Sequence, residues 1–323
     1  FYYPNRNISQ FYKKIFQNHS QFQRMWYFHT MTPDEVIIFK NVKPEVFMIL
    51  AQQAIKYALV SVAFTYNRMD KNKLSDRINN ITKGKIAEYL FFHYCGQNGI
   101  KVEPDPCHTP FWMPDNRDFF WLGGEWDIKN NYFYCSDKDF REFDCTQLPA
   151  LIPNKSTYDQ WSKRNHHLIT SSRFNAYVFT FIRLDPKERL FFNTNLNEDQ
   201  LMFIISIVNT FNKGVQKEMP FDDSWFFQTL NEKGPTNYIS LRYCPELIIT
   251  GCANPRYWHL FRDIPPEDVS NPYLNYQDNS NWYHNQHGVV SFLNGVFVTK
   301  IRNRVCPVSL LPSFQSIVHR LKN

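Results

Sequence analysis

Hydrophobic and polar residues follow two different periods along this chain of 323 residues. Over residues 44–64 and 82–96, apolar residues recur every three or four positions, which predicts two helices. Pro44 suits the first turn of one helix, and Thr82 and Gly96 suit the N-cap and the stop of the other. Two further helices are predicted, at residues 158–167 and 201–211.

Strand patterns lie between and after these helices. The apolar residues that follow Asp118 and the alternation along residues 125–129 predict a hairpin, with Gly123-Gly124 as its turn. A longer apolar run predicts a buried strand at residues 175–184. Other strands are predicted at residues 99–103, at 238–242 and 246–251 as a β-pair, and at 299–304.

The hairpin carries the candidate chemistry. Alternation places Asp127 and Lys129 on one face of their strand, with Trp126 and Ile128 on the other, and Asp118 begins the preceding strand. Two carboxylates and an ammonium are therefore expected at one point. Hydrolysis of a phosphodiester needs this set, because carboxylates hold Mg²⁺ against the phosphate and a lysine orients the nucleophile and offsets the developing charge.

A second acid competes for the first position. Asp115 follows Pro114 three residues before Asp118, and its neighbours Pro, Asn and Arg favour a turn. Asp118 is preferred because it begins the apolar strand.

The hairpin resembles the active site of the PD-(D/E)XK nuclease superfamily, which includes many restriction endonucleases. The pattern of that superfamily is an acid on one strand, a short hairpin, and then Asp or Glu, any residue, and Lys; it falls on Asp118, Asp127 and Lys129. Superfamily members often carry a Gly-x-x-Ala-Glu-like helix before the hairpin, and its Glu joins the metal site. Residues 84–88 fit that description, which implies that Glu88 completes the ligand set.

The resemblance covers residues 78–184 and implies the fold. We expect an α/β (α+β) protein with a restriction-endonuclease-like core, in which helices flank a central mixed β-sheet. The expected organisation is a mostly helical N-terminal region (1–76), a nuclease core with additions (77–260), and a C-terminal region of loop and strand (261–323) that could contact DNA.

The charge balance permits a nucleic-acid partner without indicating one. Lys and Arg number 36 against 30 Asp and Glu, which gives a net charge of +6. Each basic candidate for phosphate contact has an equally plausible reading as a solvated surface residue. These candidates are Lys83, Lys85, Lys163, Arg164, Arg173, Lys300, Arg302 and Arg304.

Cysteine content and hydropathy bear on the compartment. The chain has seven cysteines, an odd number, and contains no Cys-x-x-Cys motif, which argues against a disulfide scaffold or a compact zinc site. No continuous apolar run is long enough to cross a bilayer, and no signal-peptide pattern is visible. We therefore expect a cytoplasmic protein with no membrane partner.

These observations predict a Mg²⁺-dependent endonuclease that cuts double-stranded DNA, most like a type II restriction enzyme, with Mn²⁺ able to substitute. A homodimer would suit symmetric cleavage of both strands. One alternative is a repair, recombination or mobile-element nuclease of the same fold. The other is a non-catalytic nucleic-acid-binding protein.

Overall fold

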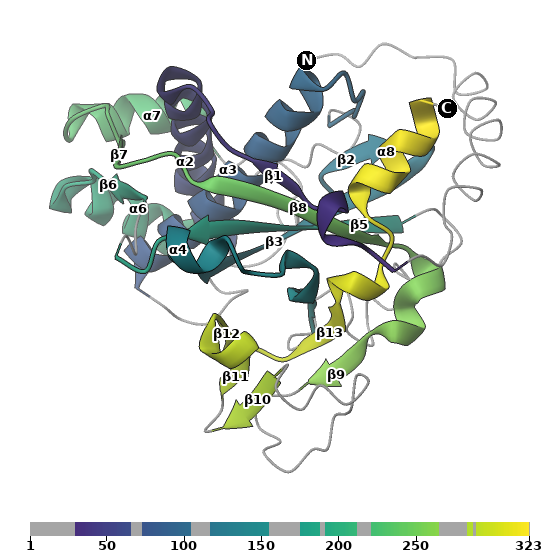
Figure 1. The fold of residues 1–323 in the computed structure, drawn as a ribbon. Coiled ribbons are helices and arrows are strands. Elements are labelled where there is room, and N and C mark those ends of the chain that lie inside the picture. The colour runs from purple at the N-terminus through teal and green to yellow at the C-terminus, as the bar shows by residue number, and fades with distance from the viewer. Residues whose placement is uncertain are drawn as a thin grey trace.

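A curled five-stranded sheet forms the centre of this mixed α/β protein in the computed structural model (Figure 1). The structure describes residues 30–65, 73–104, 117–154, 175–187, 191–211, 221–264, 283–286 and 289–322. In spatial order the strands are β1 (Ile37–Phe39), β8 (Glu246–Ala253), β5 (Asn175–Leu184), β3 (Gly124–Tyr134) and β2 (Phe119–Trp121). The sheet is mixed, since β3 and β5 run parallel and the other neighbours antiparallel.

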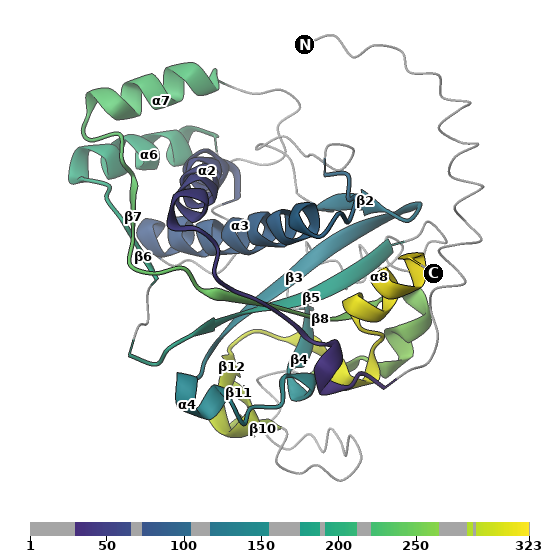
Figure 2. The same ribbon diagram turned by 45° about the horizontal axis from the view of Figure 1, so that its top comes forward.

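Helices cover one face of this sheet (Figure 2). The helix α3 (Leu74–Gln97) lies against the sheet, and α2 (Pro44–Thr65) packs on α3. Two shorter helices, α6 (Glu198–Phe211) and α7 (Asp223–Glu232), lie beside α2. The predictions of α2 from its Pro44 start and of the helix within α6 are confirmed.

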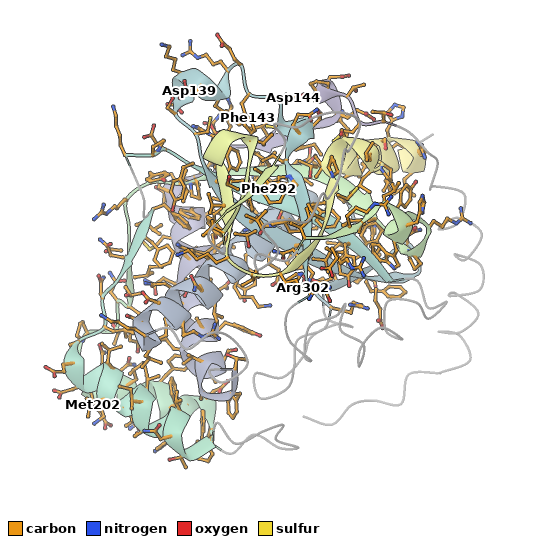
Figure 3. The ribbon with its side chains drawn as sticks, turned by 90° about the horizontal axis from the view of Figure 1, so that it is seen from below. Asp139, Phe143, Asp144, Met202, Phe292 and Arg302 are labelled. Atoms are coloured by element: carbon orange, nitrogen blue, oxygen red, sulfur yellow. The ribbon has the colours of Figure 1, made fainter. Side chains whose placement is uncertain are left out.

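Small sheets lie on the other side of the central sheet. One contains β4 (Pro149–Pro153), β13 (Asn303–Pro307) and β9 (Arg262–Ile264), and another contains β10 (Tyr283–Gln286), β11 (Val289–Phe292) and β12 (Phe297–Thr299). In Figure 3, Phe143 and Phe292 lie within this covering layer. The remaining elements are β6 (Phe192–Thr194), which pairs with β7 (Ile239–Leu241), and the helices α4 (Asp137–Phe140) and α8 (Phe314–Lys322).

Alternation along β3 separates its side chains between these two layers. Trp126 stacks on Phe119, which packs against Phe91 of α3 with ring centroids 5.4 Å apart, and the Tyr132 hydroxyl donates to the Lys83 carbonyl of α3. Even-numbered residues of β3 therefore face α3. Odd-numbered ones face the opposite side, where Phe133 contacts Phe181 and Phe181 contacts Phe297 of β12.

Among the residues that the structure describes, one helix has the length and the apolar composition needed to cross a membrane. It is α2, and 56% of its most apolar window is buried inside the protein. Core helices of water-soluble proteins pass the same test, so α2 is weak evidence for a membrane span.

The hairpin turn differs in detail from its prediction. Its two central residues are Leu122 and Gly123, with φ of 55° and 78°, and Gly124 already pairs with Trp121 in the ladder. Positive φ at both positions is the signature of a type I′ turn, whose twist matches that of the strands. The hairpin itself is confirmed, as is the strand β5.

The helix before the hairpin is longer than its sequence signals indicate. It begins at Leu74, and Thr82 is buried inside it, where its hydroxyl donates to the Ile78 carbonyl. Gly96 is helical, and the residue with left-handed backbone is Gly99, with φ of 67°. The predicted cap at Thr82 was wrong because packing against α2 and the sheet stabilises extra turns before it, whereas the predicted stop at Gly96 is one residue before the observed end at Gln97.

Several predicted strands have other partners or limits. The strands near 238–242 and 246–251 exist as β7 and β8, but they belong to different sheets. The first strand, at 99–103, is reduced to one bridge between Glu103 and Phe120. Residues 299–304 are split between β12 and β13, so Lys300, Arg302 and Arg304 do not share one strand face. The predicted helix at 158–167 lies outside the described residues.

The expected domain limit near residue 76 lies in the first turn of α3. The segment before it supplies β1 and α2, which are integral to the sheet and core.

Free thiols occur at all six cysteines within the described ranges: Cys95, Cys135, Cys145, Cys244, Cys252 and Cys306. Burial raises the pKa of Cys95 to about 12 and that of Cys244 to about 11. Protonated, buried thiols of this kind pack as small apolar side chains.

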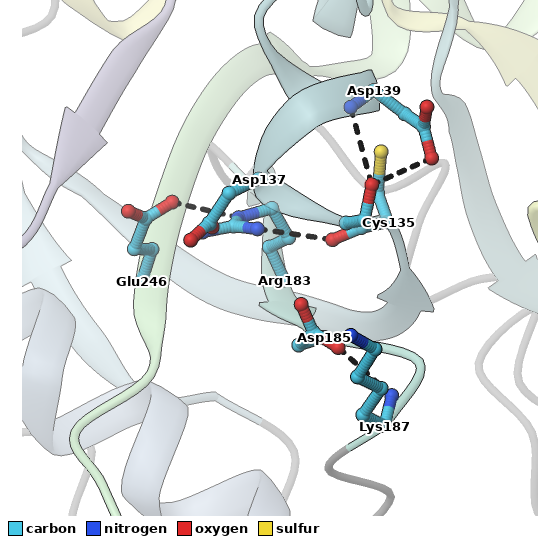
Figure 4. Close-up of polar contacts among 8 residues, drawn as sticks. Cys135, Asp137, Asp139, Arg183, Asp185, Lys187 and Glu246 are labelled. Atoms are coloured by element: carbon cyan, nitrogen blue, oxygen red, sulfur yellow. Dashed lines mark hydrogen bonds and ion pairs between the residues drawn. The ribbon is translucent and has the colours of Figure 1, made fainter.

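An arginine whose side chain is only 10% exposed ties β5 to its neighbours at the far end of the sheet (Figure 4). The Arg183 guanidinium donates to Glu246 of β8 at 2.8 Å, to Asp137 of α4 at 2.8 Å and to the Cys135 carbonyl at 2.9 Å. It also lies 4.6 Å from the centre of the Phe140 ring. These contacts join β5 to β8, to α4 and to the residue that follows β3.

We expect Arg183→Met to lower the free energy of unfolding by about 2 kcal/mol, because it removes charge-assisted hydrogen bonds and leaves Glu246 partly buried without them. Urea unfolding measures this difference. The exposed Arg242 of the β7–β8 connection is the matched control, and Arg242→Gln should change stability by less than about 0.5 kcal/mol. If Arg183→Met were as stable as the wild-type chain, the hydrogen bonds of Arg183 would not stabilise the fold.

Candidate active site

The strands β2 and β3 stop pairing at Asp118. β2 has three residues and β3 has eleven, so most of β3 extends past its partner. The Asp118 amide donates to the Trp126 carbonyl at 2.8 Å, and its carboxylate accepts from the Ile128 amide at 2.5 Å. The side chain thus occupies the next position of the ladder, which holds the carboxylate beside Asp127.

Asp127 and Lys129 form the centre of the site. Both lie on the face of β3 opposite to Trp126, as the alternation predicts. The Lys129 ammonium lies 2.8 Å from Asp127 Oδ2, and the Asp127 side chain is only 8% exposed. A carboxylate this buried needs a partner of opposite charge, which Lys129 supplies.

Tyr177 of β5 lies directly across from Asp127. The Lys129 ammonium is 5.4 Å from the centre of its ring. Burial raises the pKa of Tyr177, the charge of Asp127 raises it further, and a hydrogen bond with Arg117 opposes both effects. The phenol is therefore neutral at physiological pH, and its buried ring forms one wall of the site.

Arg117 is a site residue that the sequence analysis missed. Its Nη1 atom is 3.9 Å from Asp127 Oδ2, and its Nε atom is 3.7 Å from Glu125 Oε2. The Arg117 side chain is 10% exposed, whereas Glu125 is 56% exposed. The available signal was its position immediately before Asp118, which places it next in the chain to a candidate metal ligand.

Glu88 is not brought to this group. It pairs with Lys85 on α3 at 2.6 Å, and the Lys85 ammonium is 4.5 Å from the Tyr57 ring of α2. Since α3 covers the Trp126 face, the sheet stands between Glu88 and Asp127. Within the described ranges, no group of three or more His, Cys, Asp or Glu side chains could hold a metal ion. The predicted ligand set is thus reduced to Asp118 and Asp127.

This placement changes the expectation for Glu88. We expect Glu88→Gln to leave the Mg²⁺ concentration for half-maximal DNA cleavage unchanged, because the carboxylate lies on the opposite side of the sheet from Asp127. A metal titration of cleavage measures this value. A several-fold increase, reversed by Mn²⁺, would return Glu88 to the ligand set.

The predicted phosphate-contacting residues do not form one surface. Lys83 packs 5.4 Å from the centre of the Tyr132 ring, and burial lowers its pKa. Arg302, three residues after the end of β12, forms an ion pair with Asp263 of β9. Lys163, Arg164, Arg173 and the alternative acid Asp115 lie outside the described residues.

A different pair of basic residues lies near a segment that contacts the site. The charges of Arg256 and Arg320 both act on the hydroxyl of Tyr257, so these guanidiniums share one neighbourhood. The next residue, Trp258, contacts Tyr177 with ring centroids 5.2 Å apart. These residues come from the segment Pro255–Leu260 and from α8, and their separation in sequence concealed this proximity.

Asp118 and Asp127 fit a magnesium ion, which is commonly held by one or two carboxylates with water and substrate phosphate as the other ligands. Two nearby cations, Lys129 and Arg117, suit a phosphate that approaches the same point. No protein-family model, curated protein or solved structure matches this chain. The function is therefore inferred from the geometry of these residues.

Proposed function

We propose that this protein is a Mg²⁺-dependent endonuclease that hydrolyses phosphodiester bonds of double-stranded DNA, most like a type II restriction endonuclease. The observation that carries the proposal is the grouping of Asp118, Asp127 and Lys129 where β2 and β3 stop pairing. Two carboxylates beside one ammonium are the groups that metal-assisted phosphodiester cleavage requires.

The order of elements around the site favours the same proposal. A helix, α3, precedes the site, and Glu103 then bridges to β2, which pairs with β3, which runs parallel to β5. The resemblance to the PD-(D/E)XK superfamily implies a helix and three strands followed by a helix and a strand. Within the described residues, α3, the bridge at Glu103, β2, β3 and β5 follow one another in this order. The helix expected before β5, at residues 158–167, lies outside the described residues.

Each residue has a distinct role in the proposed reaction. Asp118 and Asp127 would hold the magnesium ion, which when bound acidifies a water molecule and polarises the phosphate. Lys129 would orient the attacking water and offset negative charge as it develops on the phosphate. Tyr177, whose ring centre lies 5.4 Å from the Lys129 ammonium, would help to hold that ammonium in place.

A non-catalytic nucleic-acid-binding protein is the second candidate. The observation that favours it is the neutralisation of Asp127 by two cations, Lys129 and Arg117, which would weaken metal binding. This arrangement would attract phosphate without cutting it.

Digestion of unmodified phage DNA with Mg²⁺, followed by sequencing of the fragment ends, separates these functions. Discrete fragments with one common end sequence would support a restriction enzyme, and paired breaks in both strands would suit a homodimer. A smear would favour a repair, recombination or mobile-element nuclease. Intact DNA that nevertheless shifts in a gel with the protein would support the binding protein.

A further inference from the structure

We propose that Arg117 is a positioning residue that competes with the divalent cation for Asp127 and moves toward Glu125 when the cation binds. This inference rests on the proposed function, because it concerns the metal site of the same reaction. Arg117 would thereby set the metal affinity of the site.

The first step of the argument concerns the shared carboxylate. Lys129 at 2.8 Å and Arg117 at 3.9 Å approach the same oxygen, Asp127 Oδ2. A divalent cation that binds Asp127 is repelled by both positive charges, and this repulsion is strong because Asp127 is buried. We therefore expect one of the two cations to withdraw from the carboxylate as the metal binds.

Arg117 is better placed to withdraw than Lys129. The Lys129 ammonium makes the shorter contact and lies against the Tyr177 ring, on the same strand as Asp127. Arg117 also hydrogen-bonds with Tyr177, but it makes the longer contact with Asp127 and has a second acid within reach, since its Nε atom is 3.7 Å from Glu125 Oε2. Glu125 and Asp127 lie on the same face of β3, so a small rotation transfers the guanidinium from one carboxylate to the other.

The consequence is a coupling between the position of Arg117 and metal binding. Such couplings typically change affinity by about 5- to 150-fold and act equally in both directions. Removal of the guanidinium should therefore tighten metal binding, although it removes a polar side chain from the site. A residue with a merely structural role would weaken metal binding when it is removed.

The test measures Mn²⁺ binding to the full chain without DNA, by the loss of the free Mn²⁺ signal in electron paramagnetic resonance. Arg117→Gln should lower the Mn²⁺ dissociation constant about tenfold, and Arg117→Lys should give an intermediate value. Arg242→Gln is the matched control, because it removes an equal charge from an exposed position next to β7 and should leave the constant unchanged.

The exposed Glu125 completes the test, since Glu125→Gln should fold normally and should weaken Mn²⁺ binding by denying Arg117 its second partner. In the Arg117→Gln background this effect should disappear, as a double-mutant cycle would show. Unchanged or weaker binding by Arg117→Gln, or an equal effect of Glu125→Gln in both backgrounds, would overturn the inference alone. Absence of Mn²⁺ binding to the wild-type chain would overturn both the inference and the proposed metal-dependent reaction.

Discussion

Asp127→Asn should lower the rate of Mg²⁺-dependent DNA cleavage by about 100- to 1,000-fold, the loss expected when one group that acts on the transition state is removed. The substitution keeps the shape of the side chain but removes the negative charge that would hold the metal. It also leaves Lys129 beside a neutral amide, at the place where the ammonium now contacts Oδ2 at 2.8 Å. DNA affinity measured without divalent ions should not fall, because phosphate contacts made elsewhere are untouched.

The matched control for Asp127→Asn is Asp199→Asn, which neutralises an exposed acid in the first turn of α6. It should cleave as the wild-type chain does. Asp118→Asn should resemble Asp127→Asn, and Asp115→Asn tests the alternative first acid. Normal cleavage by Asp118→Asn together with loss of cleavage by Asp115→Asn would show that the first acid was misassigned.

Lys129→Ala should lower the single-turnover cleavage rate by at least about 100-fold, with little change in DNA affinity. The ammonium is expected to act on the attacking water and on charge that develops in the transition state, neither of which contributes to ground-state binding. When Lys129 is removed, Arg117 still lies near Asp127, with its Nη1 atom 3.9 Å from Oδ2. Single-turnover kinetics with excess enzyme separate this rate from DNA binding.

The control for Lys129→Ala is Lys56→Ala, since Lys56 is an exposed lysine on α2, on the helical side of the sheet. It should not change the single-turnover rate. A large loss of DNA affinity in Lys129→Ala, with a normal rate once DNA is bound, would identify Lys129 as a phosphate anchor instead of a participant in the reaction.

The hairpin and its face assignment could be predicted from sequence because both depend on neighbours in the chain. A glycine at the turn and strict alternation after it are enough to place Asp127 and Lys129 together. The same holds for β5, whose apolar run is typical of a strand covered on both sides. The coarse fold, a mixed sheet with N-terminal helices and extra C-terminal strands, follows from such local patterns. That those strands form separate small sheets was not predicted.

The position of Glu88 could not be predicted in the same way. Helical periodicity shows that Glu88 is near the core face of α3, but it does not show which side of the sheet α3 covers. The side that α3 covers depends on contacts between distant residues, such as Phe91 and Phe119, which are 28 positions apart in the sequence. The start of α3 at Leu74 likewise depends on packing that local caps do not reveal.

Arg117 and the strand partners illustrate the same limit. Arg117 is adjacent to Asp118 in sequence, yet its contacts with Glu125 and Asp127 exist only after the hairpin folds. The strands β7 and β8 are separated by four residues and still pair with different sheets, because β8 is buried between β5 and β1. Pairing between distant segments overrides the tendency of neighbouring strands to form a hairpin.

Incubation of supercoiled plasmid with the purified chain and Mg²⁺, beside the same chain carrying Asp127→Asn, tests the central claim most directly. The proposal predicts nicked or linear plasmid with the wild-type chain and intact plasmid with the variant, at equal DNA binding. Intact plasmid with both chains in Mg²⁺ and in Mn²⁺, or equal cleavage by both, would contradict it.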